Sequence, residues 1–241
     1  MRLLSCSDPG LAAGTHADST LLRRLYAFAP GGGLRTNFVA TVDGAGAGAD
    51  GLTGSINNPA DKIVFDLNRE LADVVLAGAA TIDAESYGPT AGATPLVAVS
   101  NRCLLPRGWR AGAPGPGSAI LVTVKDADPA ALAGARAALG PDHVWTIGHG
   151  VVDLEQVVAR LTAEGWTKVL CEGGPRLHTE LLRRDLVDQL ALTWVPHLIA
   201  GQAPRIAHGP NLTVNLTLKH LIESAGTLLT LWERRGPAAS G

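Results

Sequence analysis

The chain has 241 residues, of which 46% are hydrophobic and 17% are charged, and its formal net charge is −2. This balance excludes an intrinsically disordered chain, and so small an excess of charge argues against binding to nucleic acid or to an anionic membrane. No apolar run approaches the roughly 18 residues of a transmembrane helix, and the amino-terminal residues lack the apolar stretch of a signal peptide. The three cysteines lie far apart, which predicts reduced thiols in a cytoplasmic protein.

Segments with helix-like and strand-like patterns alternate along the chain. The first is an expected helix at 17–29, which Pro-Gly-Gly-Gly ends before an expected strand at 34–44. The glycine-rich segment 45–58 has few side chains to pack, so we expect a mobile loop there. Apolar residues at helical spacing predict a helix at 59–71, with Pro59 in its first turn. The strands expected beyond it are 72–78, 94–101, 118–124, 143–148, 167–172, 189–199 and 226–234. The expected helices are 128–140, 153–165 and 175–185, and a helical turn is expected at 79–89.

This alternation predicts an α/β fold with a mostly parallel sheet flanked by helices. The last two expected strands have no long helix between them, so we expect an antiparallel carboxy-terminal edge. We divide the chain into an amino-terminal helix and linker at 1–33, a main domain at 34–235 and a flexible tail at 236–241.

The junction Glu-Gly-Gly-Pro at 172–175 joins an expected buried strand to an expected helix. Gly173 and Gly174 have no Cβ and let a ligand approach the backbone, and Pro175 suits the first helical turn. Free N–H groups and the helix dipole then favour an anion such as a dinucleotide pyrophosphate, with Glu172 facing the same crevice. The alternative is a tight strand-to-helix turn whose glutamate is solvated.

Two other junctions carry weaker signals. Gly-Ala-Ala-Thr at 78–81 permits close approach to the backbone and offers the Thr81 hydroxyl, although many turns of this kind bind nothing. Asp43 could accept a hydrogen bond or relay a proton, but an aspartate before glycine is most often a turn residue. The match to G-x-G-x-x-G at 46–51 leads into polar loop instead of a helix, so we exclude a Rossmann fingerprint.

The histidines and cysteines predict no metal site. His178 and Glu180 match the H-x-E half of a zinc deaminase signature, but the chain contains no C-x-x-C to complete it. The remaining histidines show neither H-x-x-x-H nor H-E-x-x-H spacing.

Together, these blocks resemble a known family. "NFVATVDG", "INNPADKIVFDLNRELADVVLAGAATIDAESYGP", "LVAVSNRCLLP" and "VLCEGGPRLHTELLRRDLVDQLALTWVPHLIAG" occur in the order and spacing of the riboflavin-biosynthesis reductase family, over roughly 34–232. This is the reductase half of the bifunctional pyrimidine deaminase/reductase. The resemblance implies a dihydrofolate-reductase-like fold and an NADPH-dependent reductase. Its expected reaction is hydride transfer to C1′ of a phosphoribosylamino-pyrimidine, which turns ribosyl into ribityl. The deaminase half is absent from the chain.

The resemblance also implies roles for individual residues. Asp43 and Glu172 are expected to be catalytic, and the expected substrate-binding residues are Asn37, Asp43, Arg69 and Glu172. Arg69 matches an arginine that contacts the substrate in relatives, but it could equally be a surface helix residue. The expected NADPH-binding residues are Ala40, Gly78, Ala79, Thr81, Ser100, Gly173, Gly174, Pro175, Arg176, Leu177 and His178.

The chain departs from the family pattern around the substrate pocket. Ser55 stands where relatives can carry a bulky aromatic residue and Glu85 where they can carry aspartate, and the loop at 44–55 is longer than expected. The substrate is therefore open: a pterin such as dihydrofolate is one alternative, and a non-catalytic NADPH-binding protein is another. The family typically forms homodimers, so we expect a homodimer with a small-molecule substrate.

Overall fold

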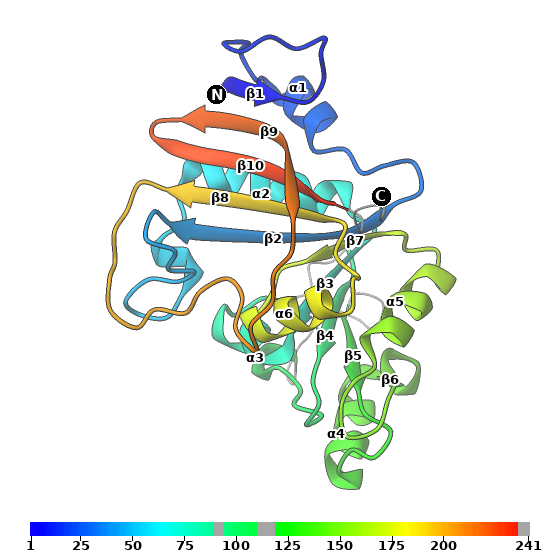
Figure 1. Ribbon diagram of the computed structural model, residues 1–241. Helices are drawn as coiled ribbons and strands as arrows, with labels where there is room; N and C mark the ends of the chain where they lie inside the picture. Colours follow the sequence, from blue (N-terminus) through cyan, green and yellow to red (C-terminus); the bar gives the residue numbers. More distant parts are fainter. Residues whose placement is uncertain (89–93, 110–118, 236–241) are drawn as a thin grey trace.

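The computed structural model describes residues 1–88, 94–109 and 119–235, and these form one ten-stranded sheet with helices on both faces (Figure 1). The predicted tail at 236–241 lies outside the described residues. The strands are β1 (Arg2–Cys6), β2 (Gly33–Thr41), β3 (Val74–Gly78), β4 (Leu96–Val99), β5 (Ala119–Thr123), β6 (Val144–Thr146), β7 (Lys168–Cys171), β8 (Gln189–Val195), β9 (Leu216–Ser224) and β10 (Thr227–Arg234).

The strand order is β1-β9-β10-β8-β2-β7-β3-β4-β5-β6. All neighbouring pairs from β8 to β6 are parallel, whereas β10 pairs antiparallel with β8, β9 with β10 and β1 with β9. The predicted mostly parallel sheet with an antiparallel carboxy-terminal edge is therefore confirmed. The edge is wider than expected, because β9 and β1 were not predicted as strands.

The helices begin and end close to where the sequence patterns place them. Asp18, Asn58, Asp128 and Asp153 each cap a helix by accepting hydrogen bonds from N–H groups of its first turn. The α-helices are α1 (Ser19–Leu25), α2 (Pro59–Leu71), α3 (Ala79–Ala84), α4 (Pro129–Leu139), α5 (Leu154–Ala163) and α6 (Pro175–Arg183), and the 3₁₀ helices are Thr53–Ser55, Arg107–Trp109 and Pro141–His143.

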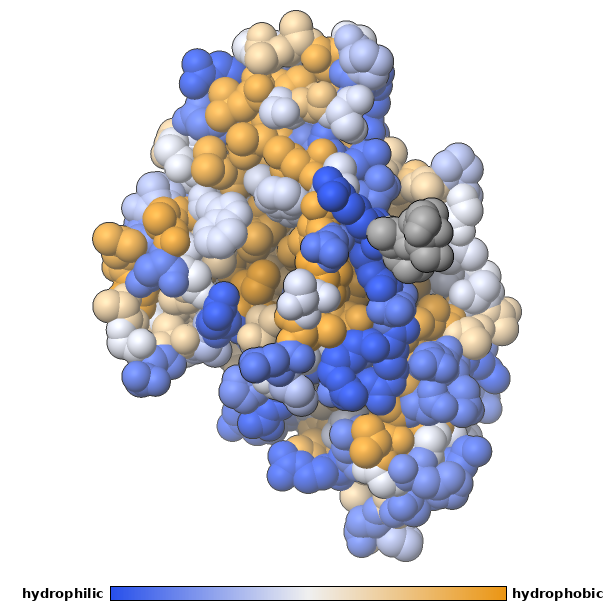
Figure 2. Space-filling model, in the orientation of Figure 1, coloured by the Kyte–Doolittle hydropathy of each residue, from blue (hydrophilic) through white to orange (hydrophobic). Residues whose placement is uncertain are grey.

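Apolar side chains pack on both faces of the sheet. On one face, α3 and α4 cover β3, β4 and β5, while α1 and α2 cover the antiparallel strands. On the other face, α5 and α6 cover the parallel strands. The antiparallel strands carry only a smaller cluster on that second face, around Leu190 and Leu192. Figure 2 shows apolar surface gathered in the region of these strands.

The amino-terminal segment is part of this core, although we expected a helix and a linker. Leu3 of β1, Leu22 of α1 and Tyr26 are buried in the cluster under α2. The fully buried Arg35 of β2 donates hydrogen bonds to the Tyr26 carbonyl at 2.6 Å and to Oδ1 of Asn68 at 2.8 Å. These bonds tie the segment to β2 and α2 and satisfy a guanidinium that would otherwise be costly to bury.

The loop after β2 is packed, so the expectation that it has few side chains to pack is wrong. Ala45, Ala47 and Ile56 are buried. The Gly46 N–H donates to the Pro204 carbonyl at 2.6 Å, and the Gly48 N–H donates to the Leu52 carbonyl at 2.9 Å. Small alanines fit where larger side chains would not, and backbone hydrogen bonds replace the side-chain contacts that the segment lacks.

His220 of β9 gives the fold a predictable response to acid. It is buried edge-on against Tyr26, with ring centroids 4.6 Å apart. Burial, assisted by the positive charge of Arg35, lowers the pKa of His220 from 6.5 to about 4. Between these values the unfolded chain binds a proton that the folded chain does not, so the free energy of unfolding falls as pH drops below 6.5.

We therefore expect His220 to account for a loss of about 3 kcal/mol between pH 6.5 and pH 4. In urea unfolding, the free energy of unfolding of His220→Phe should therefore fall less than that of the wild-type protein over this range, with a difference of about 3 kcal/mol. The matched control is His149→Phe, since His149 is exposed. A curve for His220→Phe that runs parallel to the wild-type curve would contradict the prediction.

In the described part of the chain, no helix is long and apolar enough to cross a membrane.

Candidate functional site

The carboxyl ends of β2, β3, β4 and β7 meet at one edge of the parallel sheet, where open α/β folds bind ligands. The Glu172-Gly-Gly-Pro junction lies here, between β7 and α6. The N–H of Gly78, at the end of β3, donates to the Gly173 carbonyl at 2.7 Å, and the Gly173–Gly174 peptide bond is cis. The two predicted junctions, 172–175 and 78–81, are therefore in direct contact.

The two glycines at this junction are structurally required. Gly173 has a φ of +91°, and a Cβ there would lie 3.0 Å from Cε1 of Phe38. A Cβ at Gly174 would collide with Oγ1 of Thr81. Helices α3 and α6 both start at this point, at Ala79 and Pro175, so their amino-terminal N–H groups gather around a backbone that carries no side chain.

A cavity of about 270 Å³, here called cavity A, lies on one side of the junction. Five of the predicted cofactor-binding residues line it: Gly78, Ala79, Ser100, Arg176 and Leu177. The wall also includes Arg102, and neither Arg102 nor Arg176 has an ion-pair partner among the described residues. The remaining lining residues are Ala80, Val99, Asn101, Leu104, Val151, Val152, Leu154, Glu180 and Arg184.

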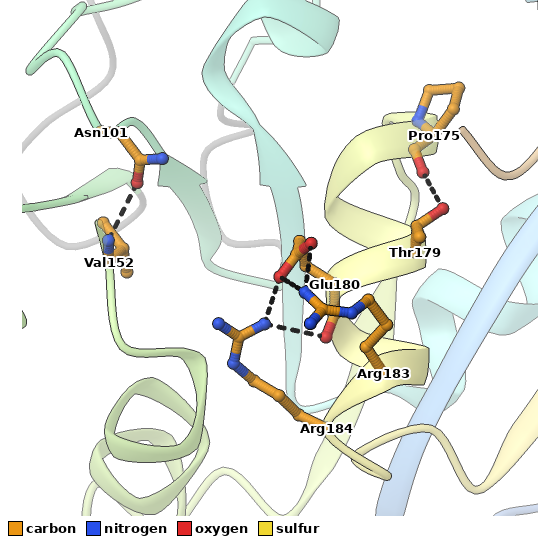
Figure 3. A network of polar contacts seen from close by, with 7 residues as sticks. All are labelled: Asn101, Val152, Pro175, Thr179, Glu180, Arg183 and Arg184. Carbon is orange, nitrogen blue, oxygen red and sulfur yellow. Dashed lines mark hydrogen bonds and ion pairs between the residues drawn. The ribbon is translucent and has the colours of Figure 1, made fainter. Parts of the chain in front are cut away.

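The far wall of cavity A is held by a polar network (Figure 3). Glu180 of α6 pairs with Arg183 at 3.0 Å and also with Arg184. Across the cavity, Oδ1 of Asn101 accepts a hydrogen bond from the Val152 N–H at 2.9 Å. Glu180 thus shares its one negative charge between two arginines, while Arg102 and Arg176 have no ion-pair partner among the described residues.

A second cavity of about 220 Å³, here called cavity B, lies on the other side of the junction. Four predicted residues line it: Asn37, Thr81, Glu172 and Pro175. Of the others, the sequence analysis placed only Glu85 and the loop 44–55 near the substrate pocket, because β2, this loop, α2 and the loop after α3 come together only in the folded chain. These other residues are Phe38, Val39, Gly46, Thr53, Gly54, Asn57, Asp61, Lys62, Phe65, Glu85, Tyr87 and Ile206.

Glu172 and Arg69 form an ion pair at the base of this site. Nε and Nη2 of Arg69 donate to the two carboxylate oxygens of Glu172 at 2.7 and 2.6 Å. The Glu172 side chain is 2% exposed and that of Arg69 31% exposed. The guanidinium also stacks over Phe65 and Tyr87, at 4.6 and 5.1 Å from their ring centroids. The solvated-glutamate interpretation is therefore wrong, and Arg69 holds Glu172.

Cavity B contains further acidic groups. Burial raises the pKa of Asp61 above its usual value, and Asp61 is only 5% exposed. Burial also raises the pKa of the Tyr87 hydroxyl. One carboxylate oxygen of Glu85 accepts a hydrogen bond from the Thr53 N–H at 2.9 Å, which fixes the loop after β2 against the end of α3.

Six predicted site residues line neither cavity. Gly173 and Gly174 form the junction itself and Arg69 binds Glu172, whereas Asp43, Ala40 and His178 lie elsewhere. Asp43 is exposed, and its carboxylate accepts hydrogen bonds from the Thr41 hydroxyl and from the N–H groups of Ile199 and Ala200, at 3.2 and 2.7 Å. It therefore joins the turn after β2 to the loop after β8, in agreement with the simple turn interpretation of its sequence. Ala40 is buried in the same cluster as Leu190 and Leu192, on one face of the sheet.

His178 also lies outside the linings of both cavities. It is 2% exposed and stacks on Phe38, with ring centroids 4.5 Å apart. Its Nδ1 is 2.9 Å from the Ile206 carbonyl and its Nε2 is 3.3 Å from the Thr36 hydroxyl. Burial lowers the pKa of His178, so the neutral ring joins α6, β2 and the loop after β8. The described residues contain no group of three potential metal ligands.

Comparison with known proteins decides the family. Residues 33–229, from β2 into β10, match the RibD C-terminal domain family. The chain belongs to this family. The match confirms the resemblance seen in the sequence blocks, and the RibD C-terminal domain includes both cavities and the junction between them.

Individual relatives agree with this assignment. A 2,5-diamino-6-ribosylamino-4(3H)-pyrimidinone 5′-phosphate reductase of Aquifex aeolicus is 27% identical over 96 residues, which is 37% of this chain. The match spans 43% of the length of that relative.

Solved structures share the fold at lower identity. A pyrimidine reductase-like protein from Corynebacterium diphtheriae is 19% identical with a TM-score of 0.73, over 86% of this chain and 93% of its own. Rib7, the riboflavin biosynthesis reductase of Saccharomyces cerevisiae, is 17% identical with a TM-score of 0.62. The match covers 92% of this chain and 94% of Rib7.

Proposed function

We propose that this RibD C-terminal domain is an NADPH-dependent reductase of a phosphoribosylamino-pyrimidine. The observation that carries the proposal is the pair of cavities that meet at the Glu172-Gly-Gly-Pro junction, one lined by small residues and unpaired arginines and the other by aromatic and acidic side chains. The family assignment and the reductase activity named for the Aquifex relative support it.

Cavity A fits a dinucleotide. Gly78 lines this cavity without a side chain, and the N-termini of α3 and α6 favour negative charge beside it. Arg102 and Arg176 add two positive charges, which suit the additional phosphate that distinguishes NADPH from NADH. The Ser100 hydroxyl accepts a hydrogen bond from the Leu104 N–H at 2.8 Å and can still donate one to a ligand.

Cavity B suits the pyrimidine and its ribosyl phosphate. Phe38, Phe65 and Tyr87 offer flat apolar surface to a heterocycle. Lys62 is the one basic residue among the described lining residues, and its amine, which also pairs with Asp66, lies at the exposed end where a phosphate can remain partly hydrated. We assign the phosphate to Lys62 in place of Arg69, because Arg69 is occupied by Glu172.

In the proposed reaction NADPH supplies a hydride. The hydride adds to C1′, the bond from C1′ to the ring oxygen breaks, and that oxygen takes one proton, which gives the ribityl product. Arg69 fixes the Glu172 carboxylate at the point where the two cavities meet, so Glu172 can orient the ribosyl group there. We give Asp43 no part in the chemistry, because its carboxylate is bonded to backbone N–H groups outside both cavities.

A direct assay tests the proposal. Purified protein with NADPH should lose absorbance when a phosphoribosylamino-pyrimidine is added, and mass spectrometry should identify the ribityl product. Dihydrofolate, tested in parallel, is expected to give little oxidation. Rapid oxidation with dihydrofolate alone would make this a pterin reductase, and NADPH binding without turnover of either substrate would indicate a non-catalytic protein.

A further inference from the structure

We infer that Asp61 recognises one edge of the pyrimidine, so that cavity B selects a 2-aminopyrimidinone over the corresponding uracil. The inference rests on the proposed function, since it specifies which phosphoribosylamino-pyrimidine the site accepts. The observation behind it is that cavity B contains hydrogen-bond acceptors that have no partner among the described residues.

Asp61 is the carboxyl group with capacity to spare. It occupies the first turn of α2, is 5% exposed and lines cavity B. Both oxygens of Glu172 accept hydrogen bonds from Arg69, and Glu85 accepts one from the Thr53 N–H. The one hydrogen-bond partner of the Asp61 carboxyl among the described residues is Thr193 of β8, so at least one of its oxygens is left without a partner there.

A second buried acceptor lies in the same cavity. Oδ1 of Asn57 is buried and has no hydrogen-bond partner in the described part of the chain. Asn57 lines cavity B four residues before Asp61, next to the Asn58 cap of α2. A buried acceptor without a partner is costly, so a ligand that donates hydrogen bonds here removes a penalty that the empty site carries. The two residues together call for a ligand edge rich in N–H groups.

The two pyrimidines differ at the edge that such acceptors would contact. A 2-aminopyrimidin-4(3H)-one presents N3–H and the exocyclic 2-amino group side by side, which are two parallel donors. A uracil presents N3–H beside the O2 carbonyl, which is one donor and one acceptor. The free oxygen of the Asp61 carboxylate and Oδ1 of Asn57 are both acceptors, so they suit the two donors of the first edge and set an acceptor against the O2 carbonyl of the second.

The burial of Asp61 adds to this difference. Burial raises the pKa of the carboxyl, because the ionised form loses its hydration there. Two donors from a ligand compensate for that loss, whereas a carbonyl oxygen adds repulsion in a site from which water is excluded. Specificity then comes from an unfavourable contact with the wrong substrate as well as a favourable one with the right one.

The test compares two substrates on two proteins. Steady-state kcat/KM would be measured with 2,5-diamino-6-ribosylamino-4(3H)-pyrimidinone 5′-phosphate and with 5-amino-6-ribosylaminouracil 5′-phosphate. We expect the wild-type protein to prefer the first by about 100-fold. Asp61→Asn presents one acceptor and one donor, as the uracil edge requires, so the preference should vanish or reverse. Asp66→Asn on the exposed side of the same helix is the matched control and should keep the wild-type ratio.

Every outcome bears on the inference. A wild-type protein that uses both substrates equally or prefers the uracil overturns it, and so does an Asp61→Asn variant that loses both activities in equal proportion. If Asp61→Asn does not fold, calorimetric affinities of the wild-type protein for the two ribityl products decide the question through the same expected ratio. Failure of the proposed function looks different, because neither pyrimidine would then oxidise NADPH.

Discussion

Replacing Arg69 by alanine is expected to lower the free energy of unfolding by about 3 kcal/mol. The substitution removes both hydrogen bonds to a Glu172 carboxylate that is only 2% exposed. A buried charge left without its partner is far more costly than the pair was stabilising. We expect the lower end of the range for buried pairs, because the Arg69 side chain is 31% exposed and water can reach part of the space it leaves.

Urea unfolding monitored by tryptophan fluorescence measures this loss, with two comparisons. Lys62→Ala removes an exposed ion pair to Asp66 on the same helix and should cost less than about 1 kcal/mol. The double variant Arg69→Met/Glu172→Gln removes both charges and should recover most of the loss. If Arg69→Ala proved no more destabilising than Lys62→Ala, Glu172 would not depend on Arg69.

The Arg69–Glu172 ion pair could not be predicted from the sequence, although the elements that carry the two residues could. The strand before Glu172 and the helix that carries Arg69 both follow from apolar spacing and end signals, and α2 has the predicted bounds. The two residues are 103 positions apart, and no local pattern links them. Each was assigned to the substrate separately, whereas in the fold their strongest contact is with each other.

Long-range pairing explains the other differences as well. β1 and β9 are strands because they pair with each other and with β10, and short segments such as residues 2–6 carry no alternation strong enough to predict that. Asp43 and His178 were assigned through family resemblance, but their hydrogen bonds go to the loop after β8, whose path the sequence does not indicate. Gly78, Ala79 and Gly173 to Leu177 lie at the ends of β3 and β7, where the sequence suggested a junction, because strand-end glycines before a helix are a local signal.

Gly174→Ala is expected to lower the affinity for NADPH by about tenfold or more, the effect of overpacking a filled site. The new Cβ would collide with the Thr81 hydroxyl at the point where α3 and α6 begin, so one of the two helix N-termini must move away from the other. The proposed cofactor site uses both N-termini, and a shift of either one weakens it. Titration of NADPH against protein fluorescence measures the dissociation constant.

Two further variants separate this cause from a general effect of an added methyl group. Gly134→Ala adds the same atom within α4, where a Cβ meets nothing within 4 Å, and should leave the dissociation constant unchanged. Thr81→Ala combined with Gly174→Ala removes the hydroxyl that obstructs the new Cβ, so part of the affinity should return. Because Thr81 itself faces cavity B, the single Thr81→Ala variant sets the reference for that recovery. A double variant as weak as Gly174→Ala alone would mean that the backbone at Gly174, and not the room beside Thr81, governs binding at this junction.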